Sequence, residues 1–492
     1  MSFLVQLSYF VAAVLFIFGL KAMSSPVTAR KGIMWAGVGM VLATVVTFFH
    51  PKIEGVGNLT LIVIALAIGG AFAWYTAKKV QMTEMPQMVA VYNGLGGGSA
   101  AAIAAVTLSQ AQRAVSTDMV EQAQIKAEET GLTVEQALRI LDGTHVGAYM
   151  GADVAILALL GAVIGSMAFS GSMVAWAKLD GRLHRSKLVE GHQWVNIGLA
   201  VATVLIGIWC FYTGSGWPIF LFFLAALAFG VFITVPIGGA DMPVVISLFN
   251  ALTGLAVGFK GYVLGNFALI IAGTVVGAAG MLLTLLMAKA MNRSLANVLF
   301  SGFGTSAGSM GEATEGEMKE LGAPDAAYMM GYAEKVVIVP GYGLAVAQAQ
   351  HKLWELVELL EGQGVEVKFA IHPVAGRMPG HMNVLLAEAG VPYDKIFDME
   401  EINEEFSTTD VALVIGANDV VNPAAREDET SPIYGMPILN VDYAENVLVV
   451  KRGRGAGFSG VENQLFFNEN TRMVFGDAQK VISEMVQTVK SM

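Results

Sequence analysis

Val336-Val337-Ile338-Val339-Pro340-Gly341-Tyr342-Gly343-Leu344-Ala345-Val346 is the stretch that decides how the C-terminal part of the chain folds. Four consecutive β-branched residues, Val336 to Val339, predict a buried strand. The strand runs into Gly341-x-Gly343-x-x-Val346 and then into an amphipathic helix, which we predict from Ala345 to Leu360. Glycine at the first two positions permits a tight turn and lets phosphate approach backbone N–H groups at a helix N-terminus. The motif therefore predicts a nucleotide site; the alternative is a bare strand-to-helix turn.

Further β-branched runs follow this motif and alternate with helical patterns. Such alternation is typical of a parallel sheet in a Rossmann-like α/β domain. We place this domain at residues 335–492. Its other predicted strands are Val365–Ile371, Val411–Ile415, Ile438–Val441 and Val447–Val450.

The end of the second predicted strand bears on which nucleotide could bind. In a standard NAD site this strand ends in Asp or Glu, which holds the ribose 2′-hydroxyl. Here it ends Ala370-Ile371-His372-Pro373, without a carboxylate. Basic residues instead fall in loops that follow strands, and they suit a cofactor with a 2′-phosphate: Arg377, Lys451, Arg452 and Arg454. NADP is therefore favoured over NAD, the alternative being that these are ordinary solvated loop charges.

The part before residue 290 reads as a series of membrane spans. The chain is 55% hydrophobic and 14% charged, with a mean hydropathy of +0.60, which is too apolar for a purely soluble protein of 492 residues. Nine apolar runs have the length of a membrane span. They are Phe3–Leu20, Gly32–Phe49, Leu59–Ala77, Met88–Leu108, Val146–Ala168, Val195–Tyr212, Trp217–Val235, Pro243–Phe259 and Tyr262–Met287. No Lys or Arg precedes the first run, so we expect it to be a retained span and not a signal peptide.

Charge distribution gives the orientation and excludes some partners. Lys and Arg concentrate in the odd-numbered loops, which predicts that the C-terminal domain is cytoplasmic. The net charge of −11 and the lack of a basic stripe argue against a nucleic-acid partner. The single cysteine, Cys210, lies inside an apolar run, and the membrane half holds no Cys/His cluster, so no metal site is predicted.

Two polar segments fall outside the predicted spans and the predicted α/β domain. The insertion from Ser109 to Thr144 contains two amphipathic stretches, which predict a small surface helical hairpin. Residues 291–334 are predicted to be a linker, because from Ser301 onward Gly, Ser, Thr and Glu predominate.

Asp241 stands out among the ionisable residues at membrane depth, where a charge is costly unless it faces water or a partner. It lies in Val235-Pro236-Ile237-Gly238-Gly239-Ala240-Asp241-Met242-Pro243, where prolines and glycines interrupt the helices. Asn250, a polar amide, follows within the next apolar span. The alternative makes Asp241 an ordinary residue at a helix start, where the dipole favours a carboxylate.

Several long motifs resemble those of a known family, the β subunit of proton-translocating NAD(P) transhydrogenase, and the resemblance covers nearly the whole chain. The motifs are Gly341 to Gln350, His372 to Asn383, Gly416-Ala417-Asn418-Asp419 and Gly239-Ala240-Asp241-Met242-Pro243. The resemblance implies a proton-conducting transmembrane domain over residues 1–290 and an NADP(H)-binding domain over residues 335–492. It also implies that NAD(H) is carried by a partner α subunit.

The resemblance further implies that NADP(H) lies in an orientation reversed from the usual one, so a pyrophosphate at the first helix is not expected. By motif matching, Tyr342 lies against the nicotinamide end, and Lys451 and Arg452 hold the 2′-phosphate. The residues of 451–458 resemble a lid over the nucleotide. The matched cofactor-binding residues are Gly341, Tyr342, Gly343, Val346, Val374, Ala375, Gly376, Arg377, Met378, Pro379, Gly416, Ala417, Asn418, Asp419, Val420, Gly435, Met436, Lys451, Arg452, Gly453, Arg454, Gly455, Ala456, Gly457, Phe458, Asp477 and Ala478.

The chain departs from the family pattern in three places. Gly453 stands where many members have Ser, which leaves Arg454 as a possible substitute phosphate donor, and Phe458 stands where many have Tyr. Many members carry a His in the fourth span, where this chain has Asn93. Because Asn does not titrate, we expect an α-subunit span to supply the protonatable residue, with Asn93 and Asn250 orienting water beside it.

The resemblance implies an enzyme in which hydride transfer between NAD(H) and NADP(H) is coupled to proton movement. Asp241, Asn250, Asn93 and Asp419 are the candidate residues for this coupling, with Asp419 sensing the state of the nucleotide; the alternative for Asp419 is that it only positions its loop. The implied setting is a dimer of α–β units among the lipids of a bacterial inner membrane.

A nucleotide-gated ion channel or transporter with a cytoplasmic sensing domain would share this two-part organisation. Such a channel needs a filter, of which a Thr-Val-Gly-Tyr-Gly-like loop is the sign. The Gly-Tyr-Gly of this chain lies in the predicted α/β domain. A third possibility, an assembly subunit with a degenerate nucleotide fold, is opposed by the intact Lys451-Arg452 pair.

Overall fold

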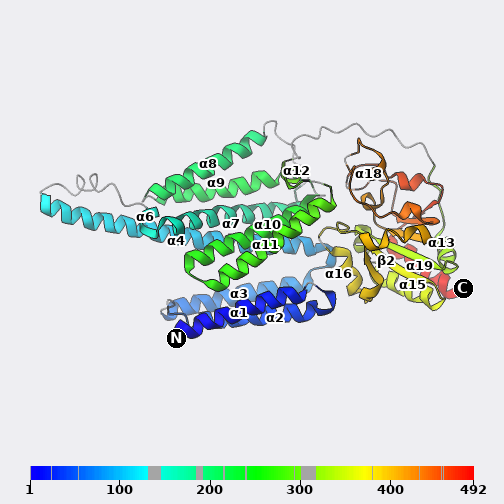
Figure 1. Cartoon of the computed structure of the whole chain (residues 1–492), viewed down its shortest axis with the longest axis horizontal. Helices are drawn as coiled ribbons and strands as arrows, with labels where there is room; N and C mark the ends of the chain where they lie inside the picture. Colours follow the sequence, from blue (N-terminus) through cyan, green and yellow to red (C-terminus); the bar gives the residue numbers. More distant parts are fainter. Residues whose placement is uncertain are drawn as a thin grey trace. The chain divides into compact units, whose positions relative to one another are not determined.

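The computed structural model describes residues 2–23, 25–51, 53, 55–130, 146–183, 192–213, 216–238, 241–292, 294–300, 317–378, 380–431, 433–455, 457 and 459–492. Contacts divide the chain into two units (Figure 1). The first comprises Met1–Val80, Gln87–Ile237 and Val245–Leu283. The second comprises Gln81–Pro86, Gly238–Val244 and Thr284–Met492.

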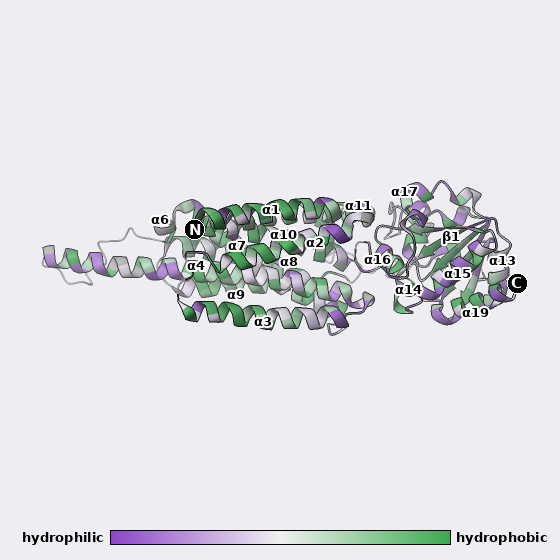
Figure 2. Cartoon of the chain, turned by 90° about the horizontal axis from the view of Figure 1, so that it is seen from below, coloured by the Kyte–Doolittle hydropathy of each residue, from purple (hydrophilic) through white to green (hydrophobic). Residues whose placement is uncertain are grey.

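Within the described ranges, nine helices are long and apolar enough to cross a membrane, which confirms the nine predicted spans. Hydrophobic residues predominate along them (Figure 2), as expected of helices that face lipid. Their bounds are α1 Ser2–Met23, α2 Pro26–Thr47, α3 Val56–Lys79, α4 Met85–Thr130, α7 Ala152–Leu179, α8 His192–Tyr212, α9 Gly216–Thr234, α10 Met242–Leu264 and α11 Phe267–Ala290.

Glycines bring α10 and α11 into close contact. A Cβ on Gly273 would lie 2.6 Å from the carbonyl oxygen of Gly254, and one on Gly280 would lie 3.0 Å from Cα of Ala251. Small residues let helices approach in this way where lipid provides no hydrophobic drive between them. The glycine spacing on α11 is therefore explained by packing.

The first helical stretch of the predicted hairpin at Ser109–Thr144 is confirmed, but it is not a separate element, because α4 continues without interruption to Thr130. Neither Gly nor Pro occurs between Ser99 and Thr130, so nothing in the sequence ends the helix. A helix of 46 residues is about 69 Å long, more than twice the thickness of the hydrocarbon core. Its last turns extend beyond the other helices and are mostly hydrophilic (Figure 2). The second half of the insertion, residues 131–145, lies outside the part that the structure describes.

The second unit contains a parallel sheet with strand order β3-β2-β1-β4-β5-β6. This is the order of a doubly wound dinucleotide-binding fold, and it confirms the predicted fold class. The strands are β1 Lys335–Pro340, β2 Glu366–Ile371, β3 Ile396–Asp398, β4 Val411–Ile415, β5 Asn446–Lys451 and β6 Thr471–Phe475.

Both faces of the sheet are buried, as alternate residues of β1 show. Val336 and Ile338 belong to one hydrophobic core, whereas Val337 and Val339 belong to the other. Five helices contribute to the first core: α13 Ala323–Gly331, α14 Tyr342–Val346, α15 Gln350–Gly362, α16 His381–Glu388 and α19 Ala478–Ser491. Burial on both faces explains why the central strands read as continuous apolar runs.

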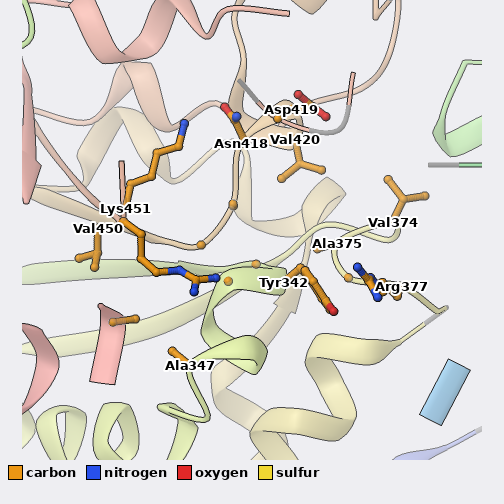
Figure 3. Close-up of a pocket in the computed structure, with 18 of the residues that line it drawn as sticks. Tyr342, Ala347, Val374, Ala375, Arg377, Asn418, Asp419, Val420, Val450 and Lys451 are labelled. Atoms are coloured by element: carbon orange, nitrogen blue, oxygen red, sulfur yellow. The ribbon is translucent and has the colours of Figure 1, made fainter. Parts of the chain in front are cut away.

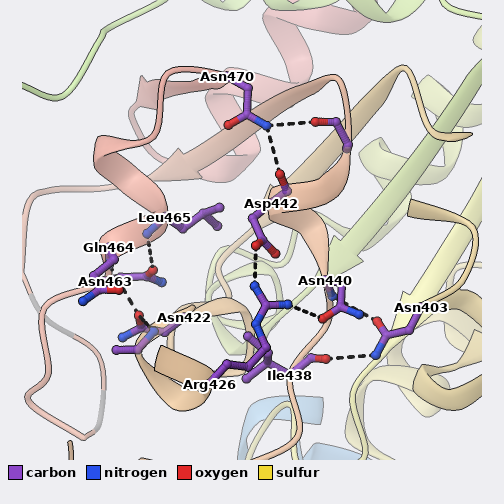
Figure 4. A network of polar contacts seen from close by, with 12 residues as sticks. Asn403, Asn422, Arg426, Ile438, Asn440, Asp442, Asn463, Gln464, Leu465 and Asn470 are labelled. Atoms are coloured by element: carbon purple, nitrogen blue, oxygen red, sulfur yellow. Dashed lines mark hydrogen bonds and ion pairs between the residues drawn. The ribbon is translucent and has the colours of Figure 1, made fainter. Parts of the chain in front are cut away.

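The predicted strand at Ile438–Val441 is wrong. The Asn403 side chain donates to the Ile438 carbonyl at 3.0 Å and accepts from the Asn440 N–H at 3.0 Å (Figure 4). The Leu439 N–H donates to the carbonyl of Val420 at 2.9 Å. Because these partners occupy the backbone polar groups, the segment cannot pair with a strand along its length.

The predicted helix from Ala345 to Leu360 is two helices. The first is α14, Tyr342–Val346, and the second is α15, which begins at Gln350. Between them Gln348 adopts a left-handed backbone conformation with φ of 50°. Left-handed residues end helices, so the chain turns at this point and places Ala347 beside the sheet edge.

Part of the predicted linker belongs to the α/β domain. Residues 323–331 form α13, and Ala323, Ala326, Ala327 and Met330 are buried in the first core. Just before α13, the Leu321 N–H donates to Met473 of β6 at 2.9 Å. The prediction of a solvated linker is thus wrong for this stretch, while residues 301–316 lie outside the described part.

Candidate functional site

The turns after β1 and β4 lie against each other at the carboxyl edge of the sheet. The Gly341 N–H donates to the Ile415 carbonyl at 2.8 Å, and the Gly343 N–H donates to the Gly416 carbonyl at 3.0 Å. The connections from β1 and β4 lead to opposite sides of the sheet, so this is the topological switch point at which such folds bind ligands.

These glycines are required by backbone packing. A Cβ on Gly343 would lie 2.6 Å from Cα of Gly416, and Gly416 has a φ of +69° that side chains rarely adopt. Since the N–H groups of Gly341 and Gly343 are already bonded to carbonyls, they are not available to a phosphate. This geometry argues against the usual pyrophosphate position at the first helix.

A cavity opens at this edge, and Figure 3 shows its lining. The predicted cofactor residues that line it are Gly341, Tyr342, Gly343, Val374, Ala375, Gly376, Arg377, Met378, Gly416, Ala417, Asn418, Asp419, Val420, Met436, Lys451, Arg452, Gly453, Gly455, Gly457 and Ala478. Val346, Gly435, Arg454 and Asp477 are not among its lining residues. Pro379, Ala456 and Phe458 lie outside the described part of the chain.

Within residues 335–492, sequence reasoning missed three residues of the lining, Ala347, Val450 and Gly476. Val450 could have been found, because it lies in a predicted strand near its carboxyl end, next to β4 in the sheet. Gly476 could not, because it follows the edge strand β6, which the sequence did not predict. Ala347 could not, because its position depends on the break between α14 and α15.

Tyr342 and Arg377 line the cavity next to each other, and the buried His381 lies beside them. The guanidinium carbon of Arg377 lies 4.3 Å from the centre of the Tyr342 ring, a cation–π distance. The ring centres of Tyr342 and His381 are 6.1 Å apart. His381 is fully buried, and its Nδ1 accepts from the Arg377 N–H at 3.1 Å. This group places an aromatic ring beside a positive charge.

His372, which directly follows β2, bonds the backbone of two loops, at Val374 and at Pro437. It is 1% exposed, its Nε2 bonds the Pro437 carbonyl at 2.8 Å, and its Nδ1 accepts from the Val374 N–H at 3.3 Å. Burial lowers the pKa of His372 below its ordinary value. The residue in place of the usual carboxylate is therefore a buried structural histidine whose ring nitrogens are both bonded to backbone groups.

Lys451 is the basic residue at the end of β5. Its ammonium donates to the Gly455 carbonyl and lies 4.6 Å from the centre of the Phe466 ring. Burial lowers the pKa of Lys451, while the negative charge of Asp419 acts in the opposite direction. Lys451 thus holds a positive charge inside the cavity and also bonds the loop that follows it.

Asp419 fastens the end of that loop to the turn after β4. The carboxylate accepts from the Ser459 hydroxyl at 2.7 Å and from its N–H at 3.0 Å. Gly457 packs so closely that a Cβ there would lie 2.8 Å from the Asn418 amide nitrogen. The neighbouring Asn418 is bonded in turn by Asn463 at 3.0 Å. The loop at 451–459 is therefore attached at both ends, by Lys451 and by Asp419.

Arg454 and Asp477 have other partners. Arg454 is 70% exposed at its side chain and pairs with Glu320 at 3.1 Å. Asp477 caps α19 by accepting from the Gln479 N–H at 3.1 Å. A role of either residue toward a phosphate stays a prediction.

In the first unit, the two candidate asparagines lie on facing helices. The side-chain amide of Asn93 on α4 donates to the Ile246 carbonyl of α10 at 3.4 Å. The backbone carbonyl of Asn93 accepts from the Thr253 hydroxyl of α10 at 3.2 Å. Ile246, Asn250 and Thr253 are spaced i, i+4, i+7, so they share one face of α10. The structure therefore brings Asn93 to the helix face that carries Asn250.

Asp241 lies apart from this pair. It immediately precedes α10, is 7% exposed, and its N–H donates to the Gly238 carbonyl at 3.2 Å. Nine residues of helix separate it from Asn250, roughly 14 Å along the axis. The asparagines and Asp241 are therefore two separate polar sites, and the functional part of each stays a prediction.

The lining fits a dinucleotide with an additional phosphate. Its positive charge comes from Arg377, Lys451 and Arg452, which suits a ligand that carries phosphate. Among the residues that the structure describes, no group of three or more His, Cys, Asp or Glu could hold a metal ion.

The chain is similar to known proteins over nearly its whole length. A family model described as "NAD(P) transhydrogenase beta subunit" matches residues 5–488. Two relatives named "NAD(P) transhydrogenase subunit beta", one from Rhodospirillum rubrum and one from a specified strain of that species, are each 45% identical over 490 residues. Each alignment covers 99% of this chain and 99% of the relative. These matches confirm the resemblance drawn from the motifs.

Proposed function

The chain belongs to the family of NAD(P) transhydrogenase β subunits, which are subunits of an oxidoreductase, and we propose that it carries NADP(H) while a partner α subunit carries NAD(H). Hydride then passes between the two nucleotides. We propose that this transfer is coupled to proton movement across the membrane through the helices of the first unit.

One observation carries the choice of nucleotide. Lys451 and Arg452 line the cavity at the end of β5, whereas the end of β2 offers the buried His372 in place of a carboxylate. Positive charge favours a 2′-phosphate, and the missing carboxylate removes the usual partner of an NAD ribose. Both differences point to NADP(H).

When bound, NADP(H) supplies the hydride chemistry at its nicotinamide ring. The work of this chain is to position that ring and control water. Tyr342, which contacts Arg377 and lies beside His381, is the aromatic side chain next to which the nicotinamide ring is placed in this proposal. The loop at 451–459, attached through Lys451 and Asp419, covers the nucleotide.

Coupling requires that a proton in the membrane change the affinity for NADP+ relative to NADPH, a coupling that is reciprocal. We propose that Asn93 and Asn250 orient water for a protonatable residue of an α-subunit span, that Asp241 takes part in the proton-linked step, and that Asp419 senses the nucleotide. One proton falling through about 150 mV supplies roughly 3.5 kcal/mol. That energy shifts a balanced equilibrium by a few hundredfold, enough to drive NADPH formation.

The setting we propose is a dimer of α–β units in a bacterial inner membrane, with the α/β domain on the cytoplasmic side. The exposed apolar side chains of α1 to α3 and α8 support contact with lipid or with α-subunit spans. A nucleotide-gated channel or transporter is disfavoured, because the Gly-Tyr-Gly motif lies at the carboxyl end of β1, where it cannot serve as a filter.

Titration calorimetry on the purified full-length chain in detergent tests the proposal. We expect NADPH to bind, and NADH to bind at least about a hundredfold more weakly, as loss of charged contacts to one phosphate implies. The chain alone should not transfer hydride, and addition of the α subunit should restore transfer. Equal affinity for both nucleotides, or turnover without a partner, would contradict the proposal.

A further inference from the structure

At the end of α9 several carbonyl groups lack an i+4 helical partner, although the Thr234 carbonyl accepts from the Ile237 N–H at 3.2 Å. In a continued helix, the N–H of residue 236 would donate to the Phe232 carbonyl, but residue 236 is proline and has no N–H. Beyond Thr234 the chain leaves the helix and crosses the short segment that ends at Asp241. Within a membrane, such freed carbonyls need partners from the protein or from water.

Two side chains from other helices supply these partners. The ammonium of Lys178, near the end of α7, donates to the carbonyls of Thr234 at 3.3 Å, Ile237 at 2.7 Å and Val235. The Nε2 of His192, the first residue of α8, bonds the Phe232 carbonyl at 2.8 Å. Three donors of one ammonium meet three acceptors, and its charge lies at the negative end of the α9 dipole.

Close packing holds α7 in place for this contact. Gly230 of α9 faces α7 so closely that a Cβ there would lie 2.5 Å from the Met167 carbonyl oxygen. About three turns further along α7, Lys178 reaches the end of α9. The clamp formed by Lys178 and His192 is therefore part of a tight helix interface and not a loose surface contact.

The clamp lies where the chain passes between the two units. Residues up to Ile237 belong to the first unit, and Gly238–Val244, which includes Asp241, belongs to the second. Lys178 binds the last carbonyls on the first side of this boundary. If a change in the protonation or position of Asp241 is to be transmitted along this segment, one end of the segment must be fixed. Otherwise the segment would move locally and the change would not reach the neighbouring helices.

We propose that Lys178 and His192 are positioning residues for the coupled reaction: they fix the start of the 236–241 segment to α7 and α8. This inference rests on the proposed function. It predicts that loss of the clamp impairs transmission between the membrane and the nucleotide site while nucleotide binding itself persists.

The test compares Lys178→Met, which removes the donors, with Lys178→Arg, which keeps a cation and donors. Vesicles that contain α and β subunits are assayed for hydride transfer driven by an imposed proton gradient, and the purified chain is titrated with NADPH. We expect Lys178→Met to lower the gradient-driven rate at least about tenfold with a Kd for NADPH within about twofold of wild type. Lys178→Arg should keep half of the rate or more.

Lys79→Met is the matched control, since Lys79 also ends a span but is exposed and contacts only the tyrosine one turn before it among the contacts described. If Lys178→Met does not accumulate, the same comparison is made at His192. His192→Ala removes its one bond to Phe232, and His192→Gln keeps a side chain that can donate. A gradient-driven rate unchanged in Lys178→Met and His192→Ala would overturn the inference, as would an equal loss in Lys178→Arg. Absence of transfer in wild-type vesicles would instead refute the proposed function.

Discussion

The Asp419 carboxylate accepts two hydrogen bonds from Ser459, one from its hydroxyl at 2.7 Å and one from its backbone N–H at 3.0 Å. This contact joins the turn after β4 to the end of the loop that starts at Lys451. The two strand ends that border the cavity are thereby connected through one carboxylate. A movement of the loop therefore alters the hydrogen bonds of Asp419, and a movement of Asp419 alters the position of the loop.

Ser459→Ala removes one of these bonds and leaves the other. We expect the loop to open more often and NADP(H) to dissociate about two- to tenfold faster, the range of a single hydrogen bond. Stopped-flow release of NADPH from the purified chain measures the rate. Ser407→Ala, at an exposed serine outside the cavity lining, is the control. An unchanged rate would mean that the contact only orders the loop in the absence of nucleotide.

Lys451→Ala should weaken NADP(H) binding by about ten- to a hundredfold, because a charged contact to phosphate is lost. The affinity of the α–β complex for NAD(H) should stay nearly constant. Calorimetry with both nucleotides on the variant and on Lys480→Ala, an exposed lysine of α19, separates the local effect from a general loss of charge. Equal weakening of both nucleotides would remove Lys451 from the 2′-phosphate site.

The buried His372 predicts a specific dependence of stability on pH. Its pKa is lowered in the folded state, mainly by burial, while the unfolded state keeps the ordinary value of 6.5. Below pH 6.5 the unfolded state therefore binds a proton that the folded state resists, so stability falls as the pH drops, until the lowered pKa is reached.

The slope from this one group is at most about 1.4 kcal/mol per pH unit. Denaturant unfolding between pH 5 and 7.5, followed by Trp354 in the α/β domain, should show a shallower slope in His372→Gln than in wild type. His351→Gln, at an exposed histidine of α15, should keep the wild-type slope. Parallel slopes in all three proteins would show that His372 does not resist protonation.

The fold could be predicted from the sequence where one physical signal decides the structure. Span-length apolar runs predict membrane helices, and strands buried on both faces read as β-branched runs, as Val411–Ile415 does. The β3 and β6 strands were missed because they lie at the sheet edges, where β3 has three residues and β6 carries Thr471 and Arg472. Short or polar edge strands give a weak periodic signal.

The remaining errors have tertiary causes. Ile438–Val441 has strand propensity, but the Asn403 side chain occupies its backbone groups. The break between α14 and α15 depends on Gln348, a non-glycine residue in a left-handed conformation. Such a conformation cannot be predicted from the residue type, because non-glycine residues rarely adopt it. At the site, the glycine motif located the switch point correctly, yet its N–H groups serve the contact between Gly343 and Gly416. A motif therefore located the cavity without giving the role of each atom.

Asp241→Asn removes the ionisable group that precedes α10 and keeps its shape. We expect gradient-driven hydride transfer in sealed vesicles to fall by roughly 5- to 150-fold, the range of a typical coupling free energy. Asp153→Asn is the matched control, since Asp153 also begins a span but bonds Tyr262 at 2.8 Å. Wild-type rates in Asp241→Asn would remove Asp241 from the mechanism.

The orientation of the chain can be tested with introduced cysteines, because the native Cys210 is buried and gives little background. Thr117 is exposed on the extension of α4, the fourth span, and therefore lies in an even-numbered loop. Tyr332 is 82% exposed in the α/β domain, which follows the ninth span. The Lys and Arg distribution puts these residues on opposite sides of the membrane. A membrane-impermeant maleimide should therefore label Thr117→Cys in spheroplasts, and Tyr332→Cys after the membrane is opened. Labelling of Tyr332→Cys in sealed spheroplasts would place the α/β domain outside, where cellular NADPH could not reach it.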